Sequence, residues 1–233
     1  MRIVFTIHQD DYDLMTTPRF YRHYKNKPYT YLGTARHSET LEELVLYETR
    51  YENASGRVWV RPKEMFFEKI EKDGKVVFRF EPIAFNYKET TQISAKNISD
   101  IEMITAKCFK QFDLQKLNLK LNSKLSENPK AFLVIAYDNS LPIGFKLGFS
   151  LDDNIFNSWL CCVLPEYRGL GVACEFMIKQ HHWVKNNNFK KIQTKTRNYF
   201  HDMIRLNLKH GFEIISTEVE SNNEITVLFQ KIV

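Results

Sequence analysis

The chain has 233 residues, of which 43% are hydrophobic and 26% are charged, and its formal net charge is +5 at pH 7. This composition is typical of a folded globular protein with one large domain or two small ones. No apolar run approaches the roughly 20 residues that a membrane-spanning helix needs, which argues against a membrane protein. Because the charge is spread over both halves of the chain, charge alone does not indicate nucleic-acid binding.

The N-terminal segment and the cysteines both indicate a cytoplasmic protein. The opening MRIVFTIHQDDYDLM holds a short apolar patch followed by three aspartates, which is too short and too acidic for a signal peptide. The cysteines lack the paired spacing of a zinc site or a disulfide framework, so we expect buried free thiols and no metal. They are Cys108, Cys161, Cys162 and Cys174. Cys161 and Cys162 are adjacent on an expected strand and should point to opposite faces.

The first part of the chain predicts short aromatic-rich strands over residues 20–25, 28–37, 43–51, 57–62 and 75–80. Asp73-Gly74 lies between two strand-like runs, which favours a hairpin. Pro62 is placed to begin a short helical turn through Phe66. We therefore predict a small β-roll or barrel domain over residues 1–84, joined by a linker over 85–92 to a second domain over 93–233.

The second domain combines helices and strands, so the chain as a whole is predicted to be an α+β protein. Helices are expected over about 98–109, 114–125, 172–185 and 199–209. Turn residues separate three strands over 131–137, 142–151 and 155–164, which predicts an antiparallel meander. Further strands are expected over 190–195, 212–216 and 224–230, completing a mixed sheet flanked by helices.

Two of the eight glycines fall within three residues, in the turn Arg168-Gly169-Leu170-Gly171 between a strand and a helix. The first turn of a helix has unpaired amides and a partial positive charge, and glycine lets backbone approach an anion closely. A glycine turn can also merely join two elements. The P-loop and dinucleotide-binding patterns do not fit, because no G-K-[ST] follows and no third glycine comes after Gly171: Cys174 stands where it would be needed, with Glu175 and Phe176 next.

The run Arg168-Gly169-Leu170-Gly171-Val172-Ala173 resembles the [QR]-x-x-G-x-[GA] signature of GNAT-type N-acetyltransferases, and the resemblance covers about residues 93–233. It implies acetyl-CoA as the acetyl donor and a primary amine as the acceptor. It places the CoA pyrophosphate on the amides of Arg168, Gly169, Gly171, Val172 and Ala173. It places the pantetheine arm along a strand edge that splays from its neighbour, at Cys161, Cys162 and Val163, with Asn198 as a further contact.

The catalytic groups are less readable. Many relatives have a tyrosine acid four residues before a Gly-Phe pair, but here that position is Asn207, before Gly211-Phe212. Asn207 is similar to the asparagine of some relatives and could bond near the CoA sulfur, or it could be a core residue satisfied by backbone. No general base is evident. The candidates near the expected channel are Asn157, Ser158, Tyr199, His201 and Asp202, whereas Glu166 is expected in an exposed turn and His181 and His182 on a helix.

Residues 17–83 resemble a small bacterial domain family of unknown function, through YRHYKNKPYTYLGTARHSETLEELVLYE, VWVRPKEMFFE and VVFRF. Three roles are open for it. It could recognise substrate through an aromatic pocket of Tyr24, Tyr47, Trp59 and Arg61. It could bind RNA, with aromatic rings stacking on bases and Arg19, Arg22, Lys25 and Lys27 on phosphates. It could also be a structural cap, since aromatic residues in a small β domain most often form the core.

The leading interpretation is an acetyl-CoA-dependent N-acetyltransferase. The alternatives are an acyl-CoA-binding regulatory module without transfer activity, and an RNA-associated acetyltransferase recruited by the first domain; nucleic acid is not favoured because the charge is even. The sequence determines neither the acceptor nor the oligomeric state.

Overall fold

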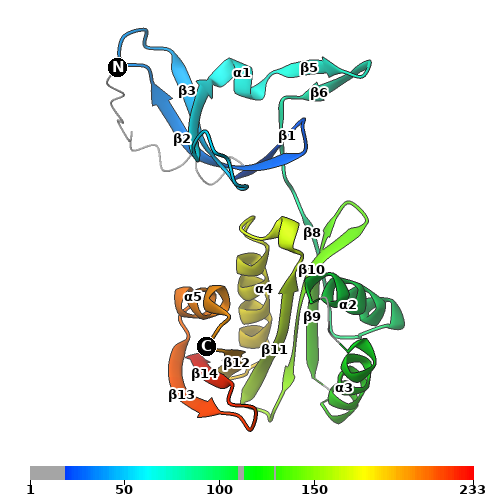
Figure 1. The fold of residues 1–233 in the computed structure, drawn as a ribbon. Coiled ribbons are helices and arrows are strands. Elements are labelled where there is room, and N and C mark those ends of the chain that lie inside the picture. Colours follow the sequence, from blue (N-terminus) through cyan, green and yellow to red (C-terminus); the bar gives the residue numbers. More distant parts are fainter. Residues whose placement is uncertain (1–18, 110–112, 129) are drawn as a thin grey trace. The chain divides into compact units, whose positions relative to one another are not determined.

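The computed structural model describes residues 19–233 except 110–112 and 129, so the N-terminal segment discussed above lies outside the described residues. The chain divides into two compact units, with the boundary between Ala84 and Phe85. Each unit has its own sheet, and Figure 1 shows the elements of both. None of the described helices is long and apolar enough to cross a membrane.

The first unit is built on a five-stranded antiparallel sheet in the order β4-β3-β2-β1-β7, with a separate β5–β6 hairpin. Its elements are β1 (Phe20–His23), β2 (Lys27–Arg36), β3 (Glu43–Thr49), β4 (Val58–Pro62), α1 (Lys63–Phe67), β5 (Lys69–Lys72), β6 (Lys75–Phe78) and β7 (Phe80–Pro82). The hairpin turns at Asp73-Gly74, where both φ angles are positive, as this dipeptide predicts.

Aromatic side chains form the core of the first unit. Phe66 of α1 is fully buried and its ring stacks on Phe80 with centroids 4.1 Å apart. Tyr21, Val45 and Tyr47 complete this buried cluster. The short helix that Pro62 begins therefore places one large ring on the inner face of the sheet, which a domain this small needs in order to bury enough apolar surface.

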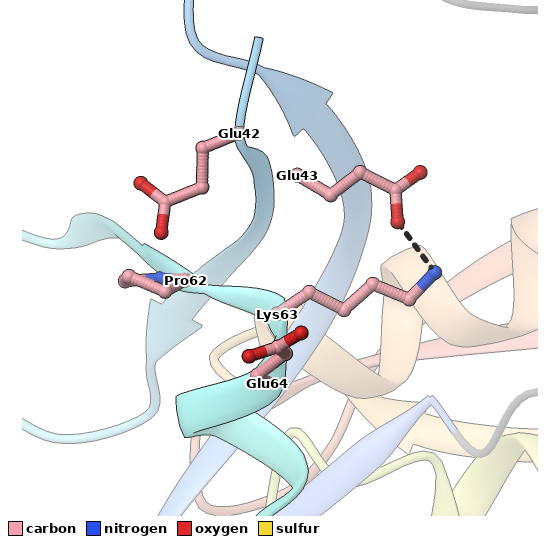
Figure 2. Close-up of a pocket in the computed structure, with 5 residues that line it drawn as sticks. All are labelled: Glu42, Glu43, Pro62, Lys63 and Glu64. Carbon is pink, nitrogen blue, oxygen red and sulfur yellow. Dashed lines mark hydrogen bonds and ion pairs between the residues drawn. The ribbon is translucent and has the colours of Figure 1, made fainter. Parts of the chain in front are cut away.

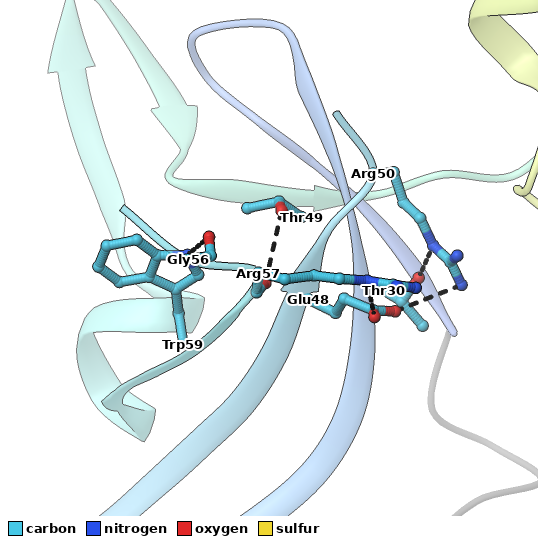
Figure 3. A network of polar contacts seen from close by, with 7 residues as sticks. All are labelled: Thr30, Glu48, Thr49, Arg50, Gly56, Arg57 and Trp59. Atoms are coloured by element: carbon cyan, nitrogen blue, oxygen red, sulfur yellow. Dashed lines mark hydrogen bonds and ion pairs between the residues drawn. The ribbon is translucent and has the colours of Figure 1, made fainter. Parts of the chain in front are cut away.

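A polar network ties β2, β3 and the approach to β4 together (Figure 3). The Glu48 carboxylate pairs with Arg57 and lies 3.7 Å from an Arg50 guanidinium nitrogen. Arg50 Nε also donates to Thr30 Oγ1 at 2.5 Å, and the indole nitrogen of Trp59 donates to the Gly56 carbonyl at 3.1 Å. These partners are all within the domain, so the network is structural.

The second unit has a seven-stranded mixed sheet in the order β13-β14-β12-β11-β10-β9-β8, in which only β11 and β12 pair in parallel among the described strands. The strands are β8 (Asn86–Thr90), β9 (Ala131–Asp138), β10 (Leu141–Ser150), β11 (Ile155–Val163), β12 (Lys191–Arg197), β13 (Glu213–Val219) and β14 (Ile225–Ile232). The helices are α2 (Ala95–Cys108), α3 (Leu114–Glu127), α4 (Val172–Asn186) and α5 (His201–Lys209). Strands β9, β10 and β11 form the expected antiparallel meander.

Helices cover both faces of this sheet, with α2 and α3 on one side and α4 and α5 on the other (Figure 1). From α4, the apolar stripe of Phe176, Met177 and Val184 is fully buried against the sheet. Helix α2 begins at Ala95, earlier than its apolar periodicity indicates, because Ser94 and Asn97 form a capping box.

Residues 85–92, which we expected to be a linker, instead contribute an edge strand. Strand β8 pairs antiparallel with β9 from Asn86 to Thr90. Its sequence NYKET is polar because an edge strand is only partly covered, and Tyr87 is its main inward anchor, with its ring 5.8 Å from that of Phe176. The strand is stabilised by its apolar partner β9, which its own sequence does not reveal.

Candidate active site

The glycine turn forms an open helix N-terminus. Gly169 and Gly171 have φ angles of +75° and +79°, a region that side chains disfavour. Gly171 is the N-cap of α4, and no side chain caps the helix. The amides of the first turn therefore lack the intrahelical partners that later residues have, which is the arrangement that binds phosphate groups.

Arg168 holds this turn against the preceding strand. Its Nε donates a hydrogen bond to the Val163 carbonyl at 3.1 Å, and the Cys108 sulfur lies 3.5 Å from the same oxygen. The Val163 carbonyl is thus already used within the protein. The resemblance placed the CoA pyrophosphate on the Arg168 amide, but that amide donates to the Pro165 carbonyl at 3.2 Å, so Arg168 positions the turn instead.

Strands β11 and β12 separate after a short paired stretch. Their parallel register runs only from Ile155 to Asn157, opposite residues 191–193, although β11 continues to Val163 and β12 to Arg197. At the point of divergence Thr194 Oγ1 donates to the Ser158 carbonyl at 2.7 Å. Beyond it, the edge of β11 that carries Cys161 and Cys162 has no ladder to β12, so its backbone groups on that side are available to a ligand.

A bulge in β11 lies at the same point. Residues 158 and 159 together oppose the single residue Gly148 of β10. A Cβ at Gly148 would overlap the Phe156 ring and the Asn157 carbonyl, so the glycine is needed for this close approach. Bulges increase local strand twist, which accords with the end of the β11–β12 pairing at this point.

Two buried polar side chains, one on β11 and one on α5, have no partner among the residues that the structure describes. Ser158 and Asn207 are each 1% exposed, and neither the Ser158 hydroxyl nor the two polar atoms of the Asn207 amide makes a hydrogen bond. The interpretation of Asn207 as a core residue satisfied by backbone is therefore not supported. Buried polar groups are normally paired, so unpaired ones indicate a place where a ligand or water completes the bonding.

Two further buried polar residues, Lys146 and Gln180, were missed from the sequence. Lys146 of β10 is 2% exposed, and burial lowers its pKa. Gln180 of α4 is fully buried, and both of its amide atoms lack a described partner. The only signal for Lys146 was a charged residue inside the apolar run PIGFKLGFSL, and Gln180 gave none.

The neighbouring cysteines point to opposite faces, as expected. Lys146 pairs with Cys161 across the strands and acts on it electrostatically, whereas Cys162 contacts Cys108 at the end of α2. All four cysteines are free thiols. Only Cys162 is buried, so the expectation of buried thiols was wrong for the other three, which are partly exposed.

The candidate acid and base residues do not converge. Tyr199 is 55% exposed, and Asp202 pairs with Arg205 at 2.8 Å on the surface. The other candidates are exposed: Glu166, His182, Asn198 and His201. The backbone amide of Asn198, at the end of β12, donates to the Ile225 carbonyl at 2.8 Å. Burial and the nearby Lys231 ammonium lower the pKa of His181 to about 3, so it is neutral. Asn157 is partly buried on β11.

In the first unit, the predicted aromatic pocket does not form as a whole. Tyr47 is buried in the core, with Trp59 packed against it, and the Arg61 guanidinium lies 5.9 Å from the centre of the Phe80 ring. A surface pocket of about 330 Å³ lies elsewhere, lined by Glu42, Glu43, Pro62, Lys63 and Glu64 (Figure 2). Since Lys63 already pairs with Glu43 at 2.9 Å, this pocket does not define a ligand.

The comparisons with known proteins agree with both resemblances. The family model described as the GNAT acetyltransferase family matches residues 98–212, and a model described as a protein of unknown function, DUF1653, matches residues 19–82. The second domain therefore matches the GNAT acetyltransferase family, and it follows a region that matches DUF1653. GNAT acetyltransferases use acetyl-CoA, so the predicted enzyme class and cofactor are confirmed. No curated protein sequence matches the chain.

Solved structures share the fold of the second domain. Ard1 from Thermoplasma volcanium is 20% identical with a TM-score of 0.55, covering 65% of this chain and 99% of its own. The ribosomal-protein-S18-alanine N-acetyltransferase from Escherichia coli is 10% identical with a TM-score of 0.54, covering 64% and 94%. An aminoglycoside 6'-N-acetyltransferase complexed with coenzyme A is 11% identical with a TM-score of 0.51, covering 63% and 96%. At these identities the likeness is one of fold.

Proposed function

We propose that the second domain transfers the acetyl group of acetyl-CoA directly to a primary amine of a small molecule, peptide or protein. The observation that carries the proposal is the uncapped two-glycine helix start beside the opening between β11 and β12. The acceptors named for the aminoglycoside and ribosomal-protein enzymes of the same fold support an amine acceptor.

The cofactor contacts follow from this geometry. The amides of Gly169, Gly171, Val172 and Ala173 hold the pyrophosphate, because the helix start presents them without a competing cap. Arg168 fixes the turn through the bond from its Nε to β11, whereas its own amide already donates to the Pro165 carbonyl at 3.2 Å and is not free for the pyrophosphate. The edge of β11 at Cys161 and Cys162, which has no ladder to β12, receives the pantetheine arm. Val163 borders the arm without its carbonyl, which Arg168 occupies, and Asn198 borders it from the end of β12.

Asn207 assists the departure of the thiol by hydrogen bonding. Bound acetyl-CoA supplies an activated thioester, whose leaving group carries negative charge. An amide cannot give up a proton as a tyrosine acid can, so Asn207 can only donate a hydrogen bond to a developing charge. Its burial at 1% exposure places that donor away from water, where such a bond is stronger.

The test is acetyl transfer by the full chain. The protein is incubated with acetyl-CoA and a panel of free-amine peptides, aminoglycosides, polyamines and tRNA, and released CoA and acetylated product are measured by mass spectrometry. Acceptor-dependent CoA release is expected with at least one class. Absence of both CoA binding and turnover would refute the proposal.

A second candidate, an acyl-CoA-binding module without transfer, is favoured by the asparagine in place of a tyrosine at position 207. Calorimetry separates the two: CoA binding in the micromolar range without turnover on any amine would support the binding module. If the first domain recruits RNA, a salt-sensitive mobility shift should appear with the full chain.

A further inference from the structure

Two thiols lie in contact near the glycine turn of residues 168–171, on the side of the sheet opposite α4. Cys108 is the last residue of α2 and Cys162 is the penultimate residue of β11. The two side chains share a hydrogen bond, and the Cys108 sulfur lies 3.5 Å from the carbonyl of Val163, the residue after Cys162. These contacts bring together two cysteines that are 54 positions apart in the chain (162 − 108).

The surroundings of the pair favour a reactive sulfur at Cys108. The hydrogen bond from Cys162 and the nearby Arg168 guanidinium lower the pKa of Cys108 to about 7, while burial and Glu166 oppose this shift. The pKa of the Cys162 thiol is raised by the same hydrogen bond and by burial. One thiol is thus easily ionised and the other stays protonated as its donor.

The two thiols also differ in access. Cys108 is partly exposed at the end of its helix, whereas Cys162 is 7% exposed. A small oxidant therefore reaches Cys108 first, and Cys162 is already in contact with Cys108. This division matches the pair of an attacking and a resolving cysteine that redox-sensitive sites use.

We propose that Cys108 and Cys162 form an oxidation site that a hydroperoxide converts to an intramolecular disulfide. The Cys108 sulfur attacks one peroxide oxygen, the O–O bond breaks, and Cys108 becomes a sulfenic acid while an alcohol or water leaves. The Cys162 sulfur then attacks the Cys108 sulfur, the S–S bond forms, the S–O bond breaks and water leaves. In total two thiols lose two electrons and two protons, and one peroxide is reduced. The cross-link joins α2 to the strand that borders the proposed cofactor channel, and it does not depend on which acceptor the enzyme uses.

The rate of the first step can be anticipated from the ionisation of Cys108. Because its pKa is lowered, a larger fraction of Cys108 is ionised at pH 7 than of an ordinary cysteine, and the thiolate is the form that attacks a peroxide.

The experiment treats the full chain with hydrogen peroxide at pH 7, blocks remaining thiols with N-ethylmaleimide and maps tryptic peptides without reduction. We expect a cross-link within one molecule between peptides 108–110 and 147–168, the second of which contains both Cys161 and Cys162. Cys161→Ser, on the other face of β11, is the matched control and should retain the cross-link. Cys162→Ser should abolish it and leave a sulfenic acid on Cys108 that dimedone traps.

The proposal is overturned if wild-type protein forms no such cross-link, or if the cross-link is lost in Cys161→Ser and kept in Cys162→Ser. The first measurement uses unaltered protein, so it does not depend on any variant folding.

Discussion

Replacing Asn207 by leucine should raise the stability of the fold and weaken the binding of the cofactor. Asn207 is 1% exposed on α5, and both atoms of its amide lack a described partner. Leucine has the same branching at Cγ and a similar volume, so the substitution removes two unpaired polar atoms without opening a cavity. A buried unpaired polar group costs about 1–3 kcal/mol.

The variant should therefore unfold with a free energy higher by about 1 kcal/mol, since relief of the unpaired amide is partly offset by imperfect packing of the new methyl groups. If the amide forms a hydrogen bond to the cofactor, the substitution loses about 1 kcal/mol of binding free energy. Since about 1.4 kcal/mol corresponds to a tenfold change in affinity, CoA should bind between fivefold and tenfold more weakly. Urea unfolding without CoA and titration calorimetry with CoA measure the two quantities.

Asn118→Leu on α3 is the matched control. Its Nδ2 donates to Glu102 Oε1 at 2.7 Å, so the substitution breaks a real bond and should lower stability while leaving CoA affinity unchanged. The reasoning is refuted if Asn207→Leu loses more than about 1 kcal/mol of stability with unaltered CoA affinity, because Asn207 would then be a structural residue after all.

Three further changes test other parts of the fold and site. Gly148→Ala should lower the unfolding free energy by about 1–3 kcal/mol, because its Cβ overlaps the Phe156 ring; an unchanged urea midpoint would contradict the close approach. Gly171→Ala should lower the unfolding free energy by about 1 kcal/mol, because alanine disfavours a φ of +79°, and it should weaken CoA binding. A variant with wild-type stability and wild-type CoA affinity would contradict the strained turn. His181, with a pKa lowered from 6.5 to about 3, is neutral when folded, so its stabilisation is complete above pH 6.5 and is lost as the pH falls toward 3. Wild type should lose about 1 kcal/mol more than His181→Gln between pH 7.5 and 5.5, and equal losses would show that His181 is protonated in the folded protein.

Local sequence was sufficient where the signal lies within a few neighbouring residues. The two-glycine turn, the apolar stripe of α4 and the Asp73-Gly74 hairpin each depend on backbone preference or on helical period, and these act over short separations. The family resemblance added the cofactor, because the signature 168–173 stands in a strand–turn–helix setting that the structure contains.

Sequence failed where an element depends on a distant partner. Strand β8 was expected to be a linker because NYKET has little apolar alternation, and only its hydrogen bonds to β9 make it a strand. The hydrogen bond from the Arg168 side chain to the Val163 carbonyl could not be predicted from the sequence either, because the two groups come within reach only after the intervening turn has formed.

By itself, then, the sequence predicted an α+β protein from its local periodicity, and its resemblance to the GNAT signature at residues 168–173 implied acetyl-CoA, because both signals lie within short stretches of chain. The tertiary structure decided the rest. It left the Ser158 and Asn207 side chains without hydrogen-bond partners among the described residues, separated β11 from β12 after residue 157, and brought Cys108 against Cys162. Each of these depends on which buried group finds a partner across the sheet, and that is settled only when elements far apart in the chain pack together.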